Sequence, residues 1–350
     1  MCAESCPKLS SILLTRMSER NFDISIVIPA YGRLELLAKT LDSLLAQTYP
    51  AREIVVVDDG SAEELRGPLE SRYGDRVRCV RQVNTGLNGA RNRGVAESRF
   101  PWLAICDSDD LWHPEKLERQ VALLRHVPEA RFCTTDFRMF SDSGEFQNHF
   151  SFAPAGFWDL PRRDFGDAGF VVDCKLYDRY LDFQPVHPSS MLIHRDMLEL
   201  VGPFNESLSR WAAEDFEFHL RCSAYPPFAF VPIPLVRYRR HANSLSADRL
   251  SSHSNGADVL EYALRHHAEA QRDPERVQSV IRRTLIESAE MAFYLERLDQ
   301  FRSFIPRIEE PPFKLRALSA AASLPPTVHR VLRQGLRLLR GKPLRAWQPQ

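Results

Sequence analysis

Four short apolar stretches alternate with helical patterns over the first third of the chain, and this alternation is what most restricts its fold. Strands that are apolar throughout and separated by helices are typical of a parallel sheet covered on both faces. The sequence therefore predicts an α/β fold with a mainly parallel sheet flanked by helices. The expected strands span residues 24–29, 53–61, 77–82 and 102–107, and the expected helices span residues 33–48, 62–73, 88–98 and 114–126.

The rest of the chain is less regular. Beyond roughly residue 258, apolar residues recur every four positions, which indicates helices. We therefore expect an N-terminal extension over residues 1–22, an α/β domain over residues 23–250 and a helical appendage over residues 251–350. Three segments before the appendage predict further elements: a strand and short helix in 187–204, a helix in 213–225, and a strand ending in a loop in 234–246.

Composition narrows the possible partners and the cellular setting. The 350 residues include 46 Lys and Arg and 46 Asp and Glu, so no net charge favours nucleic acid as a partner. The seven cysteines are scattered without a CxxC pair, which argues against a zinc site or a disulfide framework and favours a reducing cytoplasm. No stretch approaches the roughly 20 apolar residues that a membrane span requires, and residues 1–22 do not look like a signal peptide.

Polar and acidic residues follow all four expected strands. In open α/β sheets, ligands bind at the edge formed by the carboxyl ends of the strands. We therefore expect these residues to converge on one site suited to a nucleotide. At or just after the strand ends, they are Pro29 and Tyr31 for the first strand, Asp58 and Asp59 for the second, Asn84 for the third, and Asp107, Asp109 and Asp110 for the fourth.

Three carboxylates stand within four positions after the fourth strand, at Asp107, Asp109 and Asp110. Like charges packed this closely raise one another's pKa unless a cation is present. Carboxylate oxygens suit Mg²⁺ or Mn²⁺, which often share a site with substrate phosphates. The alternative is an acidic loop that stabilises the N-terminus of the following helix. The position at a strand end favours the metal.

Two residue pairs before this cluster admit two interpretations each. Asp58 and Asp59 suit hydrogen bonds to a ribose or a base, but they also fit an ordinary turn. Arg91 and Asn92 lie near a helix start, where guanidinium and backbone N–H groups suit phosphate. Neither a GxGxxG fingerprint nor a P-loop is present, so these pairs carry little weight alone.

Later candidates are equally ambiguous in isolation. Glu214 and Asp215 open a helix, and acidic residues in a first helical turn are helix-stabilising by default. His241 ends a strand and by itself fits an exposed histidine better than a metal ligand. Their interpretation depends on the motifs around them.

Seven stretches together resemble the family 2 glycosyltransferases of the GT-A fold. They occur in the family's order over roughly residues 23–246 and are jointly highly specific. The stretches are "SIVIPAYGR", "EIVVVDDGS", "NTGLNGARNRG", "DSDDLWHPEKL", "VGPFNESL", "AEDFEFHLR" and "YRRHANSLS". The resemblance implies a Rossmann-like GT-A domain, a nucleotide-diphosphosugar donor, Mn²⁺ or Mg²⁺ as cofactor, and sugar transfer with inversion.

The resemblance also implies a role for each matched residue. Asp215 matches the catalytic base, with Glu214 beside it as the second candidate. Tyr31 and Asp59 would lie against the nucleoside base. The implied metal ligands are Asp107, Asp109, Asp110 and His241, and the implied donor-binding residues are Pro29, Tyr31, Asp58, Asp59, Asn84, Arg91, Asn92, Asp107 and Asp110.

We expect a hexosyl- or N-acetylhexosaminyltransferase that uses a nucleotide sugar, with UDP-sugars favoured. Its acceptor would be a hydroxyl of a glycan or lipid-linked molecule in bacterial surface polysaccharide or glycoconjugate synthesis. One alternative is a catalytically inactive nucleotide-sugar-binding module with the same fold. The other is a sugar-nucleotide pyrophosphorylase, which would need a Gly-rich loop where this chain has "PAYGRLE".

Two further segments remain open to more than one interpretation. The aromatic residues Phe150, Phe152, Phe157 and Trp158 fit either an acceptor pocket or the core. Residues 311–350 contain eight Lys or Arg and no Asp or Glu, and part of this segment forms a basic amphipathic pattern. That pattern fits a helix lying on an anionic membrane or a terminal helix docked on its own domain. We therefore expect a cytoplasmic protein, with peripheral contact of residues 326–345 at the inner face of the plasma membrane left open.

Overall fold

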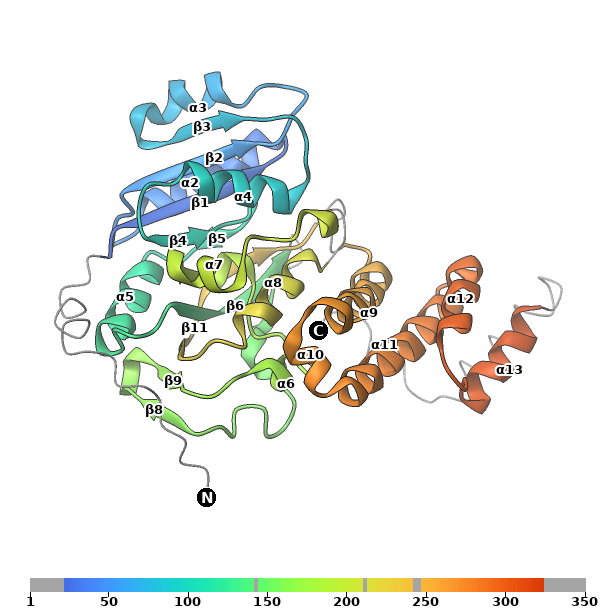
Figure 1. Cartoon of the computed structure of the whole chain (residues 1–350). Helices are drawn as coiled ribbons and strands as arrows, with labels where there is room; N and C mark the ends of the chain where they lie inside the picture. Colours follow the sequence, from blue (N-terminus) through green and yellow to red (C-terminus); the bar gives the residue numbers. More distant parts are fainter. Residues whose placement is uncertain (1–21, 142–143, 210–212, 242–246, 324–350) are drawn as a thin grey trace.

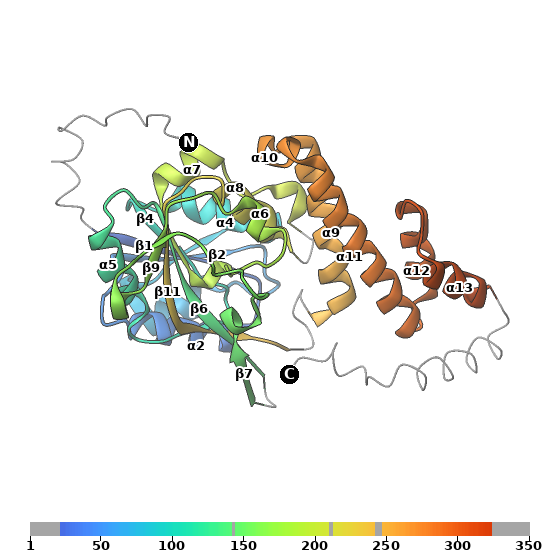
Figure 2. The same ribbon diagram turned by 90° about the horizontal axis from the view of Figure 1, so that it is seen from below.

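The fold is described by a computed structural model that covers residues 22–141, 144–209, 213–241 and 247–323. Figures 1 and 2 show a large sheet with helices on both sides and a helical region that extends away from it. Within these residues the strand order is β3-β2-β1-β4-β10-β6-β11-β9-β8, with β5 paired to β11 and β7 paired to β6. The expected α/β fold class is confirmed.

The N-terminal half of the sheet is parallel, as the sequence predicts. β1 pairs with β2 and with β4, and β2 pairs with β3, all in parallel. Each expected strand and helix of this half is present, with small shifts of its ends. The strands are β1 (Ile24–Ala30), β2 (Glu53–Asp58), β3 (Arg78–Arg81) and β4 (Trp102–Ile105), and the helices are α2 (Leu34–Leu45), α3 (Arg66–Tyr73), α4 (Leu87–Glu97) and α5 (Lys116–His126).

Strand β1 illustrates why these strands are apolar on both faces. Ile24, Ile26 and Ile28 are buried in the core that α2, α3 and α5 line, whereas Val27 belongs to the core on the opposite face. Successive side chains of a strand point to opposite sides, so a doubly covered strand needs apolar residues at every position. The buried face of α2 carries Leu37, Leu41 and Leu44.

Beyond β4 the sheet becomes mixed, which the apolar pattern did not reveal. β10 (Met191–His194) is antiparallel to β4 and β6 (Phe132–Ser141), whereas β11 (Phe228–Arg239) runs parallel to β6. A search for apolar stretches misses β6 because polar residues 134–136 lie in its middle, and they are buried. The remaining elements of this half are β5 (Leu111–Trp112), β7 (Gly144–Asn148), β8 (Arg162–Asp164), β9 (Phe170–Val172), α6 (Tyr177–Tyr180), α7 (Arg195–Val201) and α8 (Glu214–Cys222).

The aromatic residues of segment 141–186 serve mainly as core. Phe157 is buried, and the rings of Phe150 and Trp158 lie 4.8 Å apart and pack against the main hydrophobic cluster. Phe152 is exposed. None of the four is among the described residues that line the large cavity at the strand ends. The structure thus favours the core interpretation.

The C-terminal helices share one hydrophobic cluster with the sheet domain. Helix α9 packs against α8 and α11, so the helical region continues the core on the α4 and α8 side of the sheet. Figure 2 shows α12 and α13 farthest from the sheet. The helices are α9 (Arg249–His266), α10 (Ala268–Arg272), α11 (Pro274–Tyr294), α12 (Leu298–Phe304) and α13 (Phe313–Ala322).

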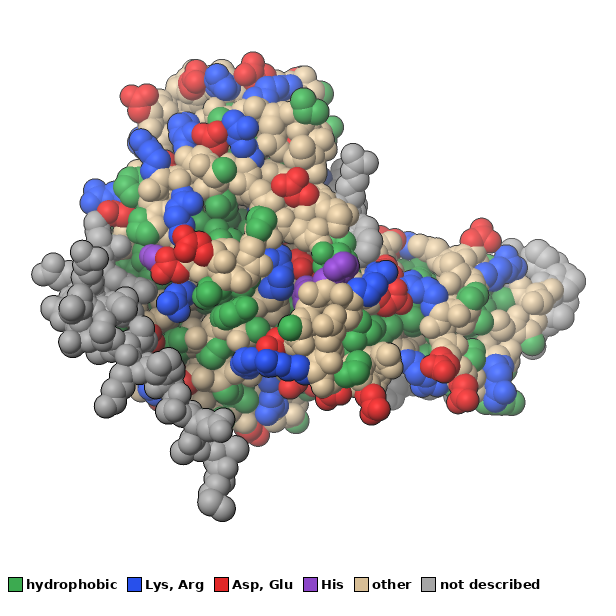
Figure 3. All heavy atoms as spheres, in the orientation of Figure 1, with side chains coloured by type: hydrophobic (Ala, Val, Ile, Leu, Met, Phe, Trp, Pro, Cys, Tyr) green, Lys and Arg blue, Asp and Glu red, His purple; other side chains and the backbone are tan. Residues whose placement is uncertain are grey.

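The basic segment 326–345 and the expected extension 1–22 lie outside the described residues, apart from Phe22. Across the part of the chain that is described, no helix combines the length and the apolar character needed to cross a membrane. On the face drawn in Figure 3, acidic and basic side chains are interspersed over both the sheet domain and the helices.

Gly94 allows α4 to approach the parallel sheet closely. A Cβ atom at this position would clash with Val27 Cγ1 and lie 3.2 Å from Val57 Cγ2. We expect Gly94→Ala to lower the free energy of unfolding by about 1–3 kcal/mol through overpacking, as measured by urea denaturation. The control Gly67→Ala, whose Cβ meets nothing within 4 Å, should be neutral or gain up to about 1 kcal/mol from helix propensity. Equal effects of the two substitutions would contradict this view of the packing.

Candidate functional site

A cavity of 580 Å³ lies at the carboxyl ends of the parallel strands and reaches α8. It is bordered by segments far apart in the sequence, including the first turns of α4 and α8 and the end of β11. Nine of the residues singled out by the sequence line it: Pro29, Tyr31, Asp59, Asn84, Arg91, Asp107, Asp109, Glu214 and Asp215. The strand ends that the sequence singled out therefore meet at one cavity.

Asp59 is held rigidly in the wall formed by the ends of β2 and β3. Its Oδ1 accepts hydrogen bonds from Gln82 Nε2 (2.8 Å) and the Thr85 backbone N–H (2.9 Å), and its Oδ2 accepts one from the Gly86 N–H (2.9 Å). Asn84 Nδ2 donates to the backbone oxygen of Asp59 at 2.9 Å. Tyr31 is 60% exposed and lines the same cavity. The wall thus combines fixed polar groups with an accessible aromatic ring.

Asp58, the neighbour of Asp59, points away from the cavity. Its carboxylate accepts hydrogen bonds from the backbone N–H groups of Ser61 (2.9 Å) and Leu65 (3.3 Å) and pairs with Arg81 Nη1 at 2.7 Å. Burial acts to raise the pKa of Asp58, but these hydrogen bonds and Arg81 hold it below its usual value. Asp58 therefore organises the loop after β2, and Asp59 is the one that meets the cavity.

Three other predicted residues lie beside the cavity and do not line it. Asn92 accepts a hydrogen bond from the Phe204 N–H (2.9 Å) and donates to the Phe204 backbone oxygen (2.9 Å) and to Glu206, so it ties α4 to the segment before α8. Asp110 is fully buried beneath the cavity floor. His241 contacts Asp109, with 2.9 Å between Nε2 and Oδ2. Asp110, which accepts a hydrogen bond from the Arg239 N–H, and His241 thus contact residues that line the cavity.

Arg91 connects the two acidic sides of the site. Its side chain is fully buried, with Nη2 3.1 Å from Asp107 Oδ1 and Nη1 2.8 Å from Glu214 Oε1. Nη1 also donates to Asn88 Oδ1 at 3.0 Å. Asp107 follows β4 and Glu214 opens α8, so one guanidinium joins segments that are 107 residues apart in the sequence. Such a buried pair strongly fixes the relative position of its partners.

The aspartate cluster after β4 carries more negative charge than its surroundings neutralise. Asp110 accepts hydrogen bonds from Ser189 Oγ (2.6 Å) and the Arg239 backbone N–H (2.9 Å). Burial, followed by the charges of Asp109 and Asp107, nevertheless raises its pKa well above the usual value. Burial also raises the pKa of Asp109, with His241 opposing that rise. A cation at this position would relieve the repulsion.

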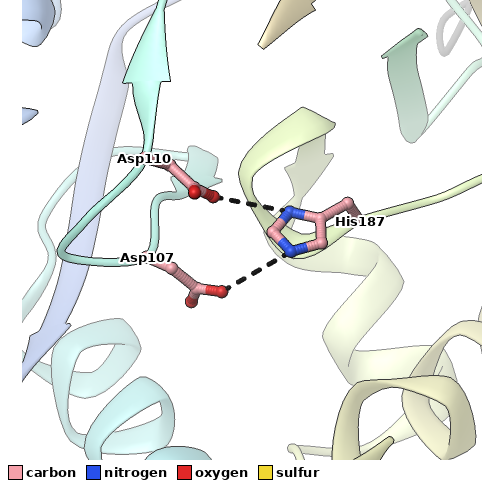
Figure 4. A group of neighbouring side chains, drawn as sticks. All are labelled: Asp107, Asp110 and His187. Carbon is pink, nitrogen blue, oxygen red and sulfur yellow. Dashed lines mark ion pairs between the residues drawn. The ribbon is translucent and has the colours of Figure 1, made fainter. Parts of the chain in front are cut away.

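His187 completes this cluster and was not among the predicted site residues. Figure 4 shows its ring between two carboxylates, with Nε2 3.8 Å from Asp107 Oδ2 and Nδ1 3.6 Å from Asp110 Oδ2. Burial lowers the pKa of His187 to about 4, so the imidazole is neutral at pH 7 and can act as a ligand. The stretch that begins with it, "HPSSMLIH", follows none of the four expected strands and offered no spacing of ligand residues as a signal.

The donor atoms present fit a hard divalent cation. Asp107, Asp110 and His187 each offer one atom, and these atoms all lie within 4.8 Å of one another. Neighbouring ligands of an octahedral ion with bonds of 2.0–2.1 Å are about 3 Å apart. The Asp109 Oδ2 and His241 Nε2 atoms, at 2.9 Å, already have this spacing, whereas the two His187 contacts are wider. The site can hold a metal ion of this class.

The two acidic residues that open α8 are differentiated by their surroundings. Glu214 is buried and paired with Arg91. Asp215 lines the cavity and keeps a partly exposed side chain, with Oδ2 3.8 Å from His219 Nδ1. Burial, and next the charge of Glu214, raises the pKa of Asp215 to about 7, although Arg91 opposes the rise. Asp215 is thus the carboxylate able to take up a proton near neutral pH.

The cavity has other lining residues that sequence reasoning did not single out. They come from a loop next to a predicted residue, from the segment before β10, from β11 and from α9. Arg33, Tyr238 and Arg239 lie within the quoted motifs, but the resemblance gave them no role. They include Arg33, Gln184, His187, Tyr238, Arg239 and Ser252. Ser252 shows that the C-terminal helical region borders the site.

Comparison with known proteins identifies the family. Residues 25–182 match the family model "Glycosyl transferase family 2". The matched segment belongs to this family. The expectation drawn from the seven motifs is therefore confirmed.

Curated relatives of this family 2 chain are similar over parts of their length. An uncharacterized glycosyltransferase of Rickettsia felis is 26% identical over 241 residues, which is 68% of this chain and 37% of that protein. The succinoglycan biosynthesis protein ExoO of Rhizobium meliloti is 36% identical over 100 residues, 28% of this chain and 29% of that protein. The chain spans about a third of the length of several curated relatives that it matches.

Solved structures share the fold of this family 2 chain. The structure of S. aureus TarS residues 1–349 in complex with UDP-GlcNAc superposes with a TM-score of 0.59 at 18% identity and covers 90% of this chain and 92% of that one. The mannosyltransferase PcManGT of Pyrobaculum calidifontis, in complex with GDP-Man and Mn²⁺, gives a TM-score of 0.53 at 17% identity and covers 96% and 88%. At such identities the likeness establishes the fold alone.

Proposed function

We propose that this family 2 glycosyltransferase moves a sugar from a nucleotide-diphosphosugar to a hydroxyl of an acceptor, with inversion and with Mn²⁺ or Mg²⁺ as cofactor. One observation carries the proposal: a single cavity is lined by Asp215 and by the aspartate cluster after β4. Arg91 lies between them, paired with Asp107 on one side and with Glu214, the neighbour of Asp215, on the other. The glycosyltransferase unit would span residues 23–250, with residues 251–350 as a helical extension that contributes to the cavity through Ser252.

Donor recognition would divide between the two ends of the cavity. We assign Tyr31 to stacking on the base, and Asp59 and Asn84 to polar contacts with the nucleoside, with Pro29 shaping the same wall. We assign Asp58 and Asn92 to positioning this wall, because their polar atoms are engaged within the protein. TarS, which shares the fold, is complexed with UDP-GlcNAc. This supports a UDP-sugar as donor and a hexosyl or N-acetylhexosaminyl group as the group that is transferred.

The reaction itself requires a base and a stabilised leaving group. A divalent cation held by Asp107, Asp109, Asp110, His241 and His187 would neutralise charge on the diphosphate that leaves. Asp215 would accept the proton of the acceptor hydroxyl as that oxygen attacks the anomeric carbon, and direct attack from the opposite side inverts this carbon. Glu214, the second candidate, is engaged with Arg91 and instead holds that guanidinium against Asp107.

We further propose a glycan or lipid-linked acceptor in bacterial surface polysaccharide or glycoconjugate synthesis. The similarity to ExoO, a succinoglycan biosynthesis protein, supports this class. A cytoplasmic location and a contact of residues 326–345 with the membrane surface belong to the same proposal. The family match favours sugar transfer over the pyrophosphorylase alternative.

The decisive test of the function is a donor screen on the full chain. With Mn²⁺ present, we expect at least one nucleotide sugar, from a panel of UDP- and GDP-sugars, to raise the melting temperature and to release nucleoside diphosphate when an acceptor is supplied. EDTA should abolish release, and added Mn²⁺ should restore it. Stabilisation without release for all acceptors would favour an inactive binding module, and no stabilisation by any donor would contradict the proposal.

Removing the base should separate catalysis from binding. We expect Asp215→Asn to reduce the transfer rate by about 10²–10⁴-fold, because general base catalysis contributes about this much. Donor affinity, measured by calorimetry, should stay close to that of the wild type. The matched control Asp299→Asn changes a fully exposed carboxylate in α12 and should retain activity. Full transfer by Asp215→Asn, or loss of donor binding, would rule out this role.

The transfer rate should also depend on pH in a defined direction. The pKa of Asp215 is raised to about 7, so the side chain retains its proton to a higher pH than an ordinary aspartate. Because a general base acts only when deprotonated, kcat/KM should rise as the pH increases through 7 and then level off. A profile measured from pH 5.5 to 8.5 that is flat would be inconsistent with Asp215 as the base.

A further inference from the structure

Arg33 reaches two of the expected metal ligands although no motif assigns it a role. Its Nη1 lies 3.4 Å from Asp109 Oδ2 and 3.0 Å from His241 Nε2, and those two atoms lie 2.9 Å from each other. Arg33 lines the cavity just before α2, two residues after Tyr31. Both Gly32 (φ 63°) and Arg33 (φ 53°) adopt the left-handed conformation, which is uncommon for a residue with a side chain.

The three contacts among these atoms cannot all be hydrogen bonds at the same time. If His241 Nε2 carries a proton, it can donate to Asp109 but cannot accept from Arg33. If Nε2 is unprotonated, it can accept from Arg33 but presents a lone pair to the Asp109 carboxylate. In either tautomer, one contact brings together groups that do not bond. The 2.9 Å between the Asp109 carboxylate oxygen and the His241 nitrogen fits a hydrogen bond, and it is also the spacing of neighbouring ligands of a divalent ion, which is about 3 Å.

We propose that Arg33 is an internal counter-cation of the Asp109–His241 pair, which a divalent cation must displace in order to bind. The displaced guanidinium then pairs with the diphosphate of the donor across the cavity that it already lines. This inference rests on the proposed function and adds a role for Arg33, the last residue of the stretch "SIVIPAYGR", to which the resemblance gave no role. Arg33 would act as a positioning residue that links metal binding to donor binding.

The proposal has a clear consequence for the order of binding. Without nucleotide, the metal ion gains Asp109 and His241 only by breaking the contacts of Arg33 with them. With nucleotide bound, the displaced guanidinium of Arg33 pairs with the diphosphate. This new ion pair offsets the free energy that the metal ion spends in separating Arg33 from Asp109 and His241. Each ligand should therefore increase the affinity for the other by the same factor, because linkage is reciprocal.

The experiment measures Mn²⁺ binding directly, by electron paramagnetic resonance of free Mn²⁺ with the full chain, with and without UDP. Arg33→Gln should tighten Mn²⁺ binding by about three- to tenfold in the absence of UDP, as expected for removal of a half-exposed ion pair. The same variant should show a smaller gain in Mn²⁺ affinity on addition of UDP than the wild type shows. Arg33→Lys keeps the charge and should stay within about twofold of the wild type.

Two further variants locate the effect. Arg93→Gln makes the same substitution at an exposed arginine that pairs with Glu97 on α4, and it should leave Mn²⁺ affinity unchanged. Adding Asp109→Asn to Arg33→Gln should cancel the gain in Mn²⁺ affinity, because Asp109, the metal ligand that Arg33 would otherwise occupy, is then lost. Far-UV circular dichroism verifies that each variant is folded.

The outcomes separate this inference from the function on which it rests. If the wild type binds Mn²⁺ with UDP but Arg33→Gln binds it no more tightly, the role of Arg33 is refuted while the proposed function stands. Equal tightening in Arg93→Gln would refute it as well, since the effect would then be a general change of charge. If no variant binds Mn²⁺ under any condition, both the role of Arg33 and the metal-dependent function fail.

Discussion

The buried guanidinium of Arg91 is the interaction on which the geometry of the site depends. It holds Asp107, at the end of a parallel strand, and Glu214, at the start of α8, on either side of one positive charge. Breaking such a pair in the interior typically costs about 3–5 kcal/mol, because a charge is left without a partner. Glu214 forms an ion pair with Arg91, whereas Asp215 forms no direct ion pair with this guanidinium. The different chemistry of these two neighbours follows from that division.

The site as a whole carries an excess of negative charge. Five carboxylates line the cavity, and Arg91 and Arg33 lie within ion-pair distance of three of them. Burial and mutual repulsion raise the pKa of Asp109 and Asp110, so the charge is not fully balanced by the protein. A divalent cation would correct this imbalance, and it would also allow a diphosphate to approach an acidic wall. The charge distribution therefore explains why metal and donor should bind together.

The two halves of the sheet contribute different parts of this site. The parallel half supplies the strand ends that carry Tyr31, Asp59 and the aspartate cluster. The mixed half brings His187 beside that cluster and continues through β11 to His241. The C-terminal helices close the remaining side, where Ser252 of α9 lines the cavity. The cavity is thus built jointly by the parallel half, the mixed half and the C-terminal helices.

The sequence by itself determined the parallel half of the fold and the edge at which the site forms. Strands that are buried on both faces are mostly apolar, and the carboxyl ends of parallel strands share one edge of the sheet. The local pattern was therefore sufficient to predict that Tyr31, Asp59 and Asp107 lie close together. It was not sufficient for β6, whose buried Thr134 and Thr135 interrupt the apolar pattern. Polar residues can be buried in this way because partners such as Ser190 come from elsewhere in the chain.

Only the tertiary structure decided how neighbouring residues divide their roles. Asp58 and Asp59 are adjacent and chemically identical, yet Arg81 and the next turn engage one while the other faces the cavity. His187 contacts the aspartate cluster although about 80 positions of sequence separate it from Asp107, and Arg33 contacts His241 although 208 positions separate the two. These relations arise from the closeness of side chains in three dimensions, and a pattern that repeats every two or four residues carries no information about them.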